Sequence, residues 1–91
     1  MPTIHLLIKG KVQGVFFRAT AKKVADKLKL TGWIKNTGDD TVEAMVTGTQ
    51  QQLEEFINWC KQGPEKADVE DVIATGEKEK LFDGFEIIRG R

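Results

Sequence analysis

Residues 10–18 (GKVQGVFFR) combine glycines with a single arginine, the residue types of an anion site. Gly14 can adopt a positive φ and lets the main chain approach a ligand closely. A short loop that runs into a helix can turn successive N–H groups toward one point, where a tetrahedral anion binds. Arg18 would complete such a site with a planar pair of donors that matches phosphate oxygens. The segment therefore predicts a site for a phosphate-sized anion, and the alternative is a solvated arginine beside a glycine.

The helix that follows this segment has an unusual beginning. A helical stripe of apolar residues predicts a helix over residues 19–30, and its members are Ala21, Val24, Ala25 and Leu28. A helix N-terminus carries about half a positive charge and usually has Ser, Asp or Asn beside it. Here the boundary has none of these, and Arg18, Lys22 and Lys23 lie at or near the start. Each such cation costs about 0.3–1 kcal/mol, and a bound anion would reverse the sign.

The composition excludes several kinds of catalytic chemistry. The chain has no serine and no tyrosine, so a Ser-His-Asp triad and a tyrosine nucleophile are impossible. It has one histidine, His5, and one cysteine, Cys60, which cannot build a His/Cys metal cage or an intrachain disulfide. The segment 10–18 lacks the Gly-Lys-Ser/Thr of a Walker loop and the cysteine of a cysteine phosphatase loop. An anion site here would therefore use main-chain amides and Arg18, with Lys11 and Lys22 adding charge weakly.

The elements that must position this segment follow from periodicity and turn signals. Alternating or apolar runs predict strands at 3–9, 32–36, 41–47, 68–75 and 85–89, with a hairpin turn at 37–40 and a charged loop at 76–84. A second helix begins after Thr49, which forms a capping box with Gln52, and ends at Gly63. This order predicts an α+β fold, the ferredoxin-like split βαβ sandwich: βαββαβ plus a fifth C-terminal strand, with both helices on one face of a mostly antiparallel sheet.

Length and charge bound the remaining possibilities. We expect residues 1–91 to form a single domain. Fourteen basic and fourteen acidic residues give a net charge of zero, which disfavours a non-specific nucleic-acid or anionic-membrane binder. The fold is shared with RNA-recognition domains, but residues 3–9 and 41–47 lack the sheet-face aromatics that read RNA. No apolar run is long enough to span a membrane and no leader precedes the domain, so we expect a cytoplasmic protein.

Two motifs resemble the signatures of the acylphosphatase family. The first is G-x-V-Q-G-V-x-F-R over residues 10–18, and the second is G-W-I-x-N-x-x-D-x-x-V-E over residues 32–43. The length and the element order are similar as well, so the resemblance covers essentially the whole chain. It implies an enzyme that hydrolyses the carboxyl–phosphate bond of acyl phosphates to a carboxylate and inorganic phosphate, without a metal or other cofactor.

The resemblance also implies roles for particular residues. The family's phosphate-binding arginine matches Arg18, and its water-orienting asparagine matches Asn36. The loop amides that hold the phosphate would come from Gln13, Gly14, Val15, Phe16, Phe17 and Arg18. Asn36 taken alone also suits a hairpin turn. The family often has Asp-Gly in this turn, whereas this chain has Asp39 and Asp40, which leaves the turn type open.

Two other interpretations remain beside the enzyme. The same loop would serve a non-catalytic module that binds a phosphate-bearing molecule without hydrolysing it. The same kind of domain also occurs within larger maturation proteins among related chains. For this chain we expect a small-molecule acyl phosphate as substrate, no nucleic-acid or membrane partner, and a monomer, because no exposed apolar stripe is evident in the sequence.

Overall fold

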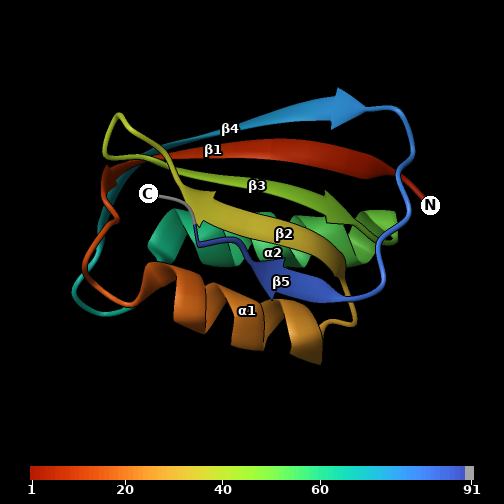
Figure 1. The fold of residues 1–91 in the computed structure, drawn as a ribbon, viewed down its shortest axis with the longest axis horizontal. Helices are drawn as coiled ribbons and strands as arrows, with labels where there is room; N and C mark the ends of the chain where they lie inside the picture. The colour runs from red at the N-terminus through yellow and green to blue at the C-terminus, as the bar shows by residue number, and fades with distance from the viewer. Residues whose placement is uncertain (90–91) are drawn as a thin grey trace.

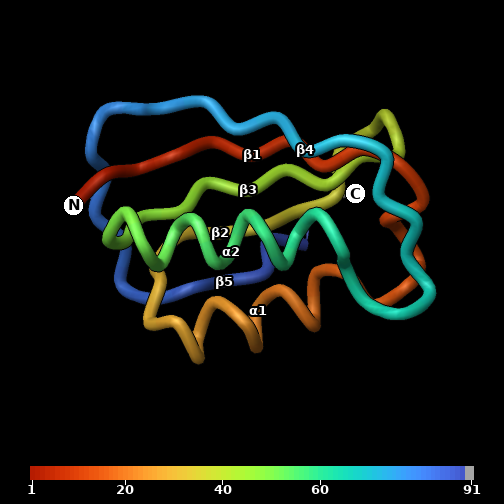
Figure 2. Tube along the Cα trace, turned by 180° about the vertical axis from the view of Figure 1, so that it is seen from behind, coloured from red at the N-terminus to blue at the C-terminus, as the bar shows by residue number. Residues whose placement is uncertain are grey.

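The computed structural model describes residues 1–89, which form one five-stranded sheet with two helices packed on one of its faces (Figures 1 and 2). In chain order the elements are β1 (Thr3–Lys11), α1 (Phe17–Lys27), β2 (Thr31–Asn36), β3 (Val42–Thr47), α2 (Gln50–Gln62), β4 (Asp68–Glu77) and β5 (Phe85–Ile87). The strand order is β4-β1-β3-β2-β5, in which β5 runs parallel to β2 and the other neighbours are antiparallel. The predicted split βαβ sandwich is confirmed, with the fifth strand beside β2.

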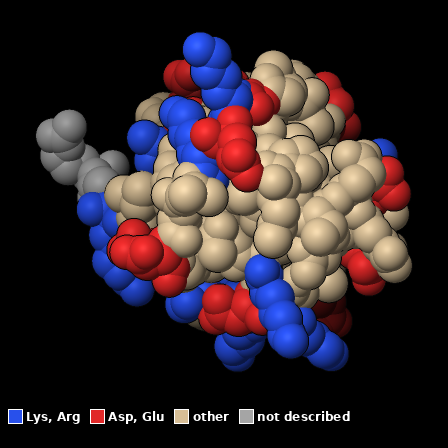
Figure 3. Space-filling view, turned by 90° about the vertical axis from the view of Figure 1, so that its right-hand side faces the viewer, with Lys and Arg blue, Asp and Glu red and all other residues tan. Residues whose placement is uncertain are grey.

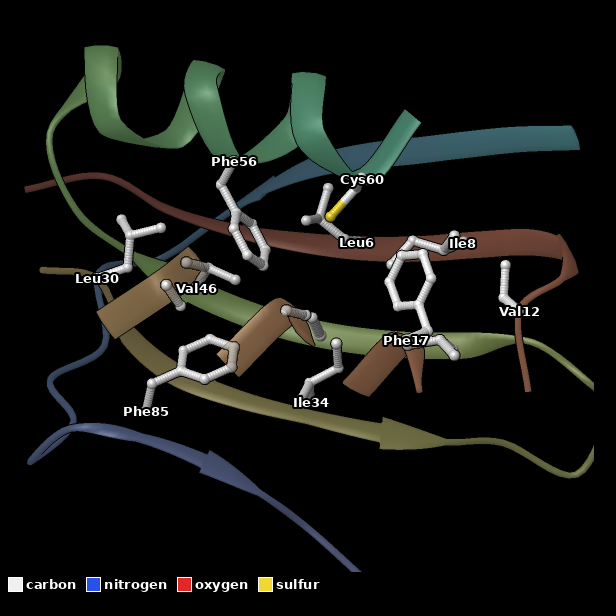
Figure 4. Close-up of a cluster of buried hydrophobic side chains, with 14 of the residues drawn as sticks. Leu6, Ile8, Val12, Phe17, Leu30, Ile34, Val46, Phe56, Cys60 and Phe85 are labelled. Atoms are coloured by element: carbon white, nitrogen blue, oxygen red, sulfur yellow. The ribbon is translucent and has the colours of Figure 1, made fainter. Parts of the chain in front are cut away.

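The core lies between the sheet and the helices, because each element turns its apolar side chains to that layer (Figure 4). α1 contributes Phe17, Ala21 and Ala25, and α2 contributes Leu53, Phe56 and Cys60. The sheet side is formed by alternate strand residues, among them Leu6, Ile8, Ile34, Ala44 and Val46. Burial of a large apolar side chain stabilises a fold by about 1.5–3 kcal/mol, so this shared layer holds both helices on the sheet.

The ends of α1 differ from the prediction of residues 19–30. The helix begins two residues earlier, at Phe17, and it ends at Lys27. Lys29 takes a left-handed conformation with φ 63°, and the N–H of Leu30 donates to the carbonyl of Ala25 at 2.9 Å. This is the Schellman ending that usually contains glycine. Because lysine occupies the left-handed position, the sequence carries no signal for the stop.

Strand bounds also differ from the expected ones. β1 continues to Lys11 and β4 to Glu77, since the two pair from Thr3–Glu77 to Lys11–Asp68. A register shift between Lys9 and Gly10 forms a β-bulge in this pair. Gly10 has φ 124°, and a Cβ there would lie 2.2 Å from the carbonyl oxygen of Asp68. Glycine is therefore required at this bulge, which bends β1 as it leaves the sheet. β5 is shorter than predicted and ends at Ile87, so 88 and 89 lie beyond it.

The topology brings three chain segments to one end of the sheet. β1 and β2 are both antiparallel to β3, and β5 is parallel to β2, so β1, β2 and β5 all run in one direction. The loop before α1, the β2–β3 hairpin and the residues after β5 consequently meet at the left-hand end of the sheet in Figure 1. The opposite end has acidic and basic side chains interspersed around an uncharged centre (Figure 3).

Candidate active site

The loop from β1 to α1 contains two residues in the left-handed region. Gly14 has φ 74°, and Phe16 has φ 63° and ψ 25°. A Cβ on Gly14 would meet nothing within 4 Å, so glycine is favoured there by its conformation and not by lack of space. Residues with such dihedral angles next to ordinary ones form concave runs of N–H groups that bind anions. The loop therefore has the backbone type of an anion nest at the start of a helix.

Side chains anchor this loop on two sides. Val12 is 1% exposed and Val15 is 7% exposed, so both insert into the core. The Nε2 of Gln13 donates to the carbonyls of Thr37 at 3.0 Å and Thr41 at 2.8 Å, both in the β2–β3 hairpin. Gln13 thus uses its side chain to fix the loop to the residue that directly follows Asn36. The sequence suggested only a role for its main-chain amide.

The start of α1 confirms the unusual helix beginning read from the sequence. Phe16 is the N-cap, no side chain caps the helix, and its first turn has no acidic residue. α2 begins in the ordinary way, with a complete capping box between Thr49 and Gln52. The uncapped N–H groups of α1 and its partial positive charge therefore remain available at the loop. Arg18 is the second residue of this helix.

A cavity of about 370 Å³ opens beside the loop. Its lining residues are Val12, Gly14, Phe16, Phe17, Arg18, Ala19, Ile87 and Arg89. Two guanidinium groups and no carboxylate are among them, and neither arginine forms an ion pair with another residue in the described part of the chain. The N-terminus of α1 and the two arginines all carry positive charge, so the cavity favours an anion.

The predicted site residues do not all line this cavity. Gly14, Phe16, Phe17 and Arg18 line it, and Phe17 is also a core residue whose ring packs 5.2 Å from that of Trp59. Val15 is buried and Gln13 faces the hairpin. Asn36 is not among the lining residues.

Asn36 is the last residue of β2, at the same end of the sheet. Its Oδ1 is buried and has no hydrogen-bond partner among residues 1–89. A buried acceptor without a partner costs about 1–3 kcal/mol, so such atoms are rare outside functional sites. β5 lies beside β2, with the N–H of Ile88 donating to the carbonyl of Ile34 at 2.9 Å. The chain after β5 therefore runs along β2 toward Asn36.

Arg89 also lines this cavity, and the sequence did not indicate it. It was assigned to the end of the last strand and given no role. Only the strand order reveals its position, because β5 is parallel to β2 and ends at the loop before α1. A basic residue at the end of the last predicted strand was the available signal, and it indicates no site until the neighbour of that strand is known.

A larger cavity, of about 650 Å³, lies on the sheet face without helices. Its lining includes the carboxylates Asp39, Asp40, Glu43 and Glu70. The Nε2 of His5 lies 2.6 Å from a carboxylate oxygen of Glu43, so this histidine is a paired residue of the sheet face. Four carboxylates disfavour a phosphate, and the smaller cavity is therefore the better anion site.

No group of three or more His, Cys, Asp or Glu side chains among the described residues is placed to hold a metal ion. No described helix is both long enough and apolar enough to cross a membrane. Cys60 is buried in the core, and this burial raises the pKa of its thiol.

Comparison with known proteins identifies the family of this chain. The acylphosphatase family model matches residues 4–87. An acylphosphatase of Thiobacillus denitrificans is 43% identical over 94% of this chain and 96% of its own length. An acylphosphatase of Bordetella parapertussis is 44% identical over 93% of this chain and 92% of its own length.

Solved structures give the same result for the fold. The acylphosphatase of Bacillus subtilis superposes with a TM-score of 0.94 at 33% identity, covering 98% of this chain and all of that one. The acylphosphatase of Coxiella burnetii gives 0.92 at 34% identity, covering 96% and 92%. A HypF structure from T. kodakarensis matches all of this chain with 12% of its own, at a TM-score of 0.83 and 30% identity. On its sequence and its fold alike, the chain belongs to the acylphosphatase family.

Proposed function

We propose that this enzyme binds the phosphoryl group of an acyl phosphate in the 370 Å³ cavity, on the loop amides of residues 13–18 and on Arg18, while Asn36 orients the attacking water. The hydrolysis of acyl phosphates follows from family membership, because the matched relatives are acylphosphatases over nearly their whole length. No comparison favours the non-catalytic binding module. One observation carries the assignment of the site: the uncapped helix start and two arginines without ion-pair partners in the described chain surround one cavity.

The chemistry suits a site without an acid or a base. Water forms a bond to phosphorus as the bond from phosphorus to the acyl oxygen breaks, and the electron pair leaves with the carboxylate. Carboxylic acids have pKa values of about 4–5, so the leaving group needs no proton at neutral pH. The protein has to bind the phosphoryl oxygens, neutralise their charge and hold the water in line.

Arg18 is assigned the neutralisation of charge. In a loose phosphoryl-transfer transition state, negative charge lies on the three equatorial oxygens. A guanidinium donates two parallel hydrogen bonds to such oxygens, which a lysine ammonium cannot imitate. Arg18 is held in the first turn of α1, so its charge adds to that of the helix N-terminus. Arg89 lines the same cavity and raises its positive potential.

Asn36 is assigned the orientation of water. Its amide does not titrate in the useful range, so it cannot be a general base, but its oxygen accepts a hydrogen bond. The buried Oδ1 without a partner among the described residues supports this role, since its lone pairs are not used by the fold. The proton of the water would pass to a phosphoryl oxygen of the substrate.

We infer that residues 1–91 act as one domain, since residues 3–87 contribute to a single sheet and its helical layer. A cytoplasmic monomer without a nucleic-acid partner is consistent with the zero net charge and with the mixed charges of the end seen in Figure 3.

Release of phosphate from benzoyl phosphate, with a chelator present, tests the proposal. We expect Arg18→Ala to lower kcat/KM by about 10³-fold or more, because arginines in this role contribute about 10³–10⁵. Arg18→Lys should also lose most of its kcat/KM, because an ammonium group cannot donate two parallel hydrogen bonds to phosphoryl oxygens. Lys23→Ala removes one exposed cation from the same helix outside the cavity, and it should retain activity within about twofold. Retained activity in Arg18→Ala would contradict the site, and saturable phosphate binding without hydrolysis would favour the binding module.

A further inference from the structure

Phe16 occupies a costly position in the loop. Its left-handed φ of 63° is unfavourable for a bulky residue, by about 1–2 kcal/mol, and glycine would adopt it freely. Its carbonyl accepts from the N–H of Thr20 at 3.1 Å and from the Oγ1 of Thr20 at 2.8 Å. Both bonds use the main chain, so any residue at position 16 would make them.

Packing of the Phe16 side chain in the core does not offset this conformational cost, because the side chain is exposed. Phe16 is 78% exposed, whereas the neighbouring Phe17 is 1% exposed. Strained positions that packing does not explain are concentrated at ligand sites. Phe16 lines the cavity that also contains Arg18, so a ligand in that cavity is the available partner for its ring.

The cavity is larger than a phosphoryl group requires. The four heavy atoms of that group occupy about 120 Å³ at ~30 Å³ for each water-sized atom, which is about a third of the 370 Å³. Besides Gly14 and the two arginines, the cavity is lined by apolar side chains, among them Phe16, Ala19 and Ile87. A substrate whose phosphoryl group lies at Gly14 and Arg18 would extend its other end toward these apolar side chains.

We infer that Phe16 is a specificity-determining residue that contacts the acyl group, and that the enzyme prefers acyl phosphates with aromatic or other large apolar acyl groups. This inference rests on the proposed placement of the phosphoryl group. Benzoyl and acetyl phosphate share the phosphoryl end and differ in the acyl end, so their ratio isolates the contact. An aromatic ring beside Phe16 gains an edge or stacking contact that a methyl group lacks.

The test compares kcat/KM for these two substrates in the wild-type protein, in Phe16→Gly and in Leu81→Gly. We expect Phe16→Gly to lower the benzoyl-to-acetyl ratio by about 3- to 10-fold, mainly through KM for benzoyl phosphate, as for loss of one aromatic contact. Any change in kcat/KM for acetyl phosphate reports on the loop main chain, which both substrates use, so the ratio of the two substrates isolates the contact with the acyl group. Leu81 is an equally apolar residue, 86% exposed and outside the cavity, so Leu81→Gly should leave the ratio unchanged.

Folding does not obscure this test, because glycine relieves the left-handed conformation at position 16. The midpoint of urea unfolding of Phe16→Gly should be equal to or above that of the wild type. An unchanged ratio, or an equal loss on both substrates, would overturn the inference and leave Phe16 only a part of the helix start. If Arg18→Ala kept its activity on acetyl phosphate, the proposed phosphoryl site would fail instead, so the two failures are distinguishable.

Discussion

At the scale of single residues, the proposed active site uses groups that do not exchange protons near neutral pH. In this proposal the guanidinium of Arg18 binds the phosphoryl group and the amide of Asn36 orients the water, while the substrate would provide both the good leaving group and the final proton acceptor. This division of work explains how a chain without serine or tyrosine, with its one histidine paired to Glu43, performs a hydrolysis. Catalysis at such a site depends more on where these two side chains are held than on their pKa values.

Asn36→Ala should separate water orientation from phosphate binding. We expect kcat to fall by about 10²-fold, because a misplaced nucleophile costs that much, while inhibition by inorganic phosphate changes less than twofold. The free energy of unfolding should fall by no more than about 1 kcal/mol, since the variant also removes a buried oxygen without a partner among residues 1–89.

Steady-state kinetics with phosphate as the inhibitor, together with urea unfolding, measure both effects. Asn58→Ala, an exposed position on α2, is the matched control and should change neither. A weaker inhibition by phosphate with normal single-turnover hydrolysis would contradict the role of Asn36 and make it a phosphate ligand.

At the scale of elements, the sequence predicts which segments form helices and strands better than it predicts their ends. Apolar periodicity identifies every element, because that pattern reflects the core. The end of α1 at Lys27 could not be predicted, because the left-handed position that follows the helix is occupied by Lys29 and not by glycine. Arg18 and Gly14 could be predicted from one contiguous loop. Arg89 and the side-chain role of Gln13 could not, because both depend on the pairing of distant strands.

The link between the loop and the hairpin predicts that Gln13 acts as a positioning residue. Gln13→Ala removes two hydrogen bonds, and we expect a loss of about 1–2 kcal/mol in the free energy of unfolding. The value of kcat should fall about 10-fold, because Asn36 directly precedes Thr37, one of the two acceptors. Gln13→Glu should lower both the free energy of unfolding and kcat further than Gln13→Ala does, since a carboxylate cannot donate to carbonyl oxygens.

Unfolding by urea and kinetics with benzoyl phosphate measure these changes in parallel. Gln51→Ala removes an exposed glutamine of α2 and is the matched control. If Gln13→Ala lost stability but kept kcat, the loop would hold its active geometry without the hairpin, and the positioning role would be wrong.

At the scale of the whole molecule, the same layer of side chains that holds both helices on the sheet also supports the loop. Phe17 lines the cavity and also belongs to the core (Figure 4). Its ring centroid lies 5.2 Å from that of Trp59. Val12 and Val15 enter the same layer. The loop is consequently rigid where it is anchored and open at Phe16, which is 78% exposed. Rigid support close to a phosphoryl site keeps its donors in place during the reaction.

The core also makes the stability of the protein depend on pH through Cys60. Burial raises the pKa of this thiol, so the folded state keeps its proton when the unfolded state, with a thiol pKa of about 8.5, releases it. Above that pH the unfolded state binds fewer protons, and the free energy of unfolding falls by about 1.4 kcal/mol for each pH unit. At lower pH the contribution of this thiol to the free energy of unfolding is constant.

Urea unfolding of the wild type and of Cys60→Ala between pH 7 and 10 measures this contribution, since the other titrating groups are common to both proteins. Cys60→Ala should be less stable at pH 7, because it leaves a small cavity beside Leu6 and Phe56 (Figure 4), and the difference should narrow as the pH rises. Parallel curves up to pH 10 would mean that the thiol ionises inside the folded protein, and that this part of the core admits water.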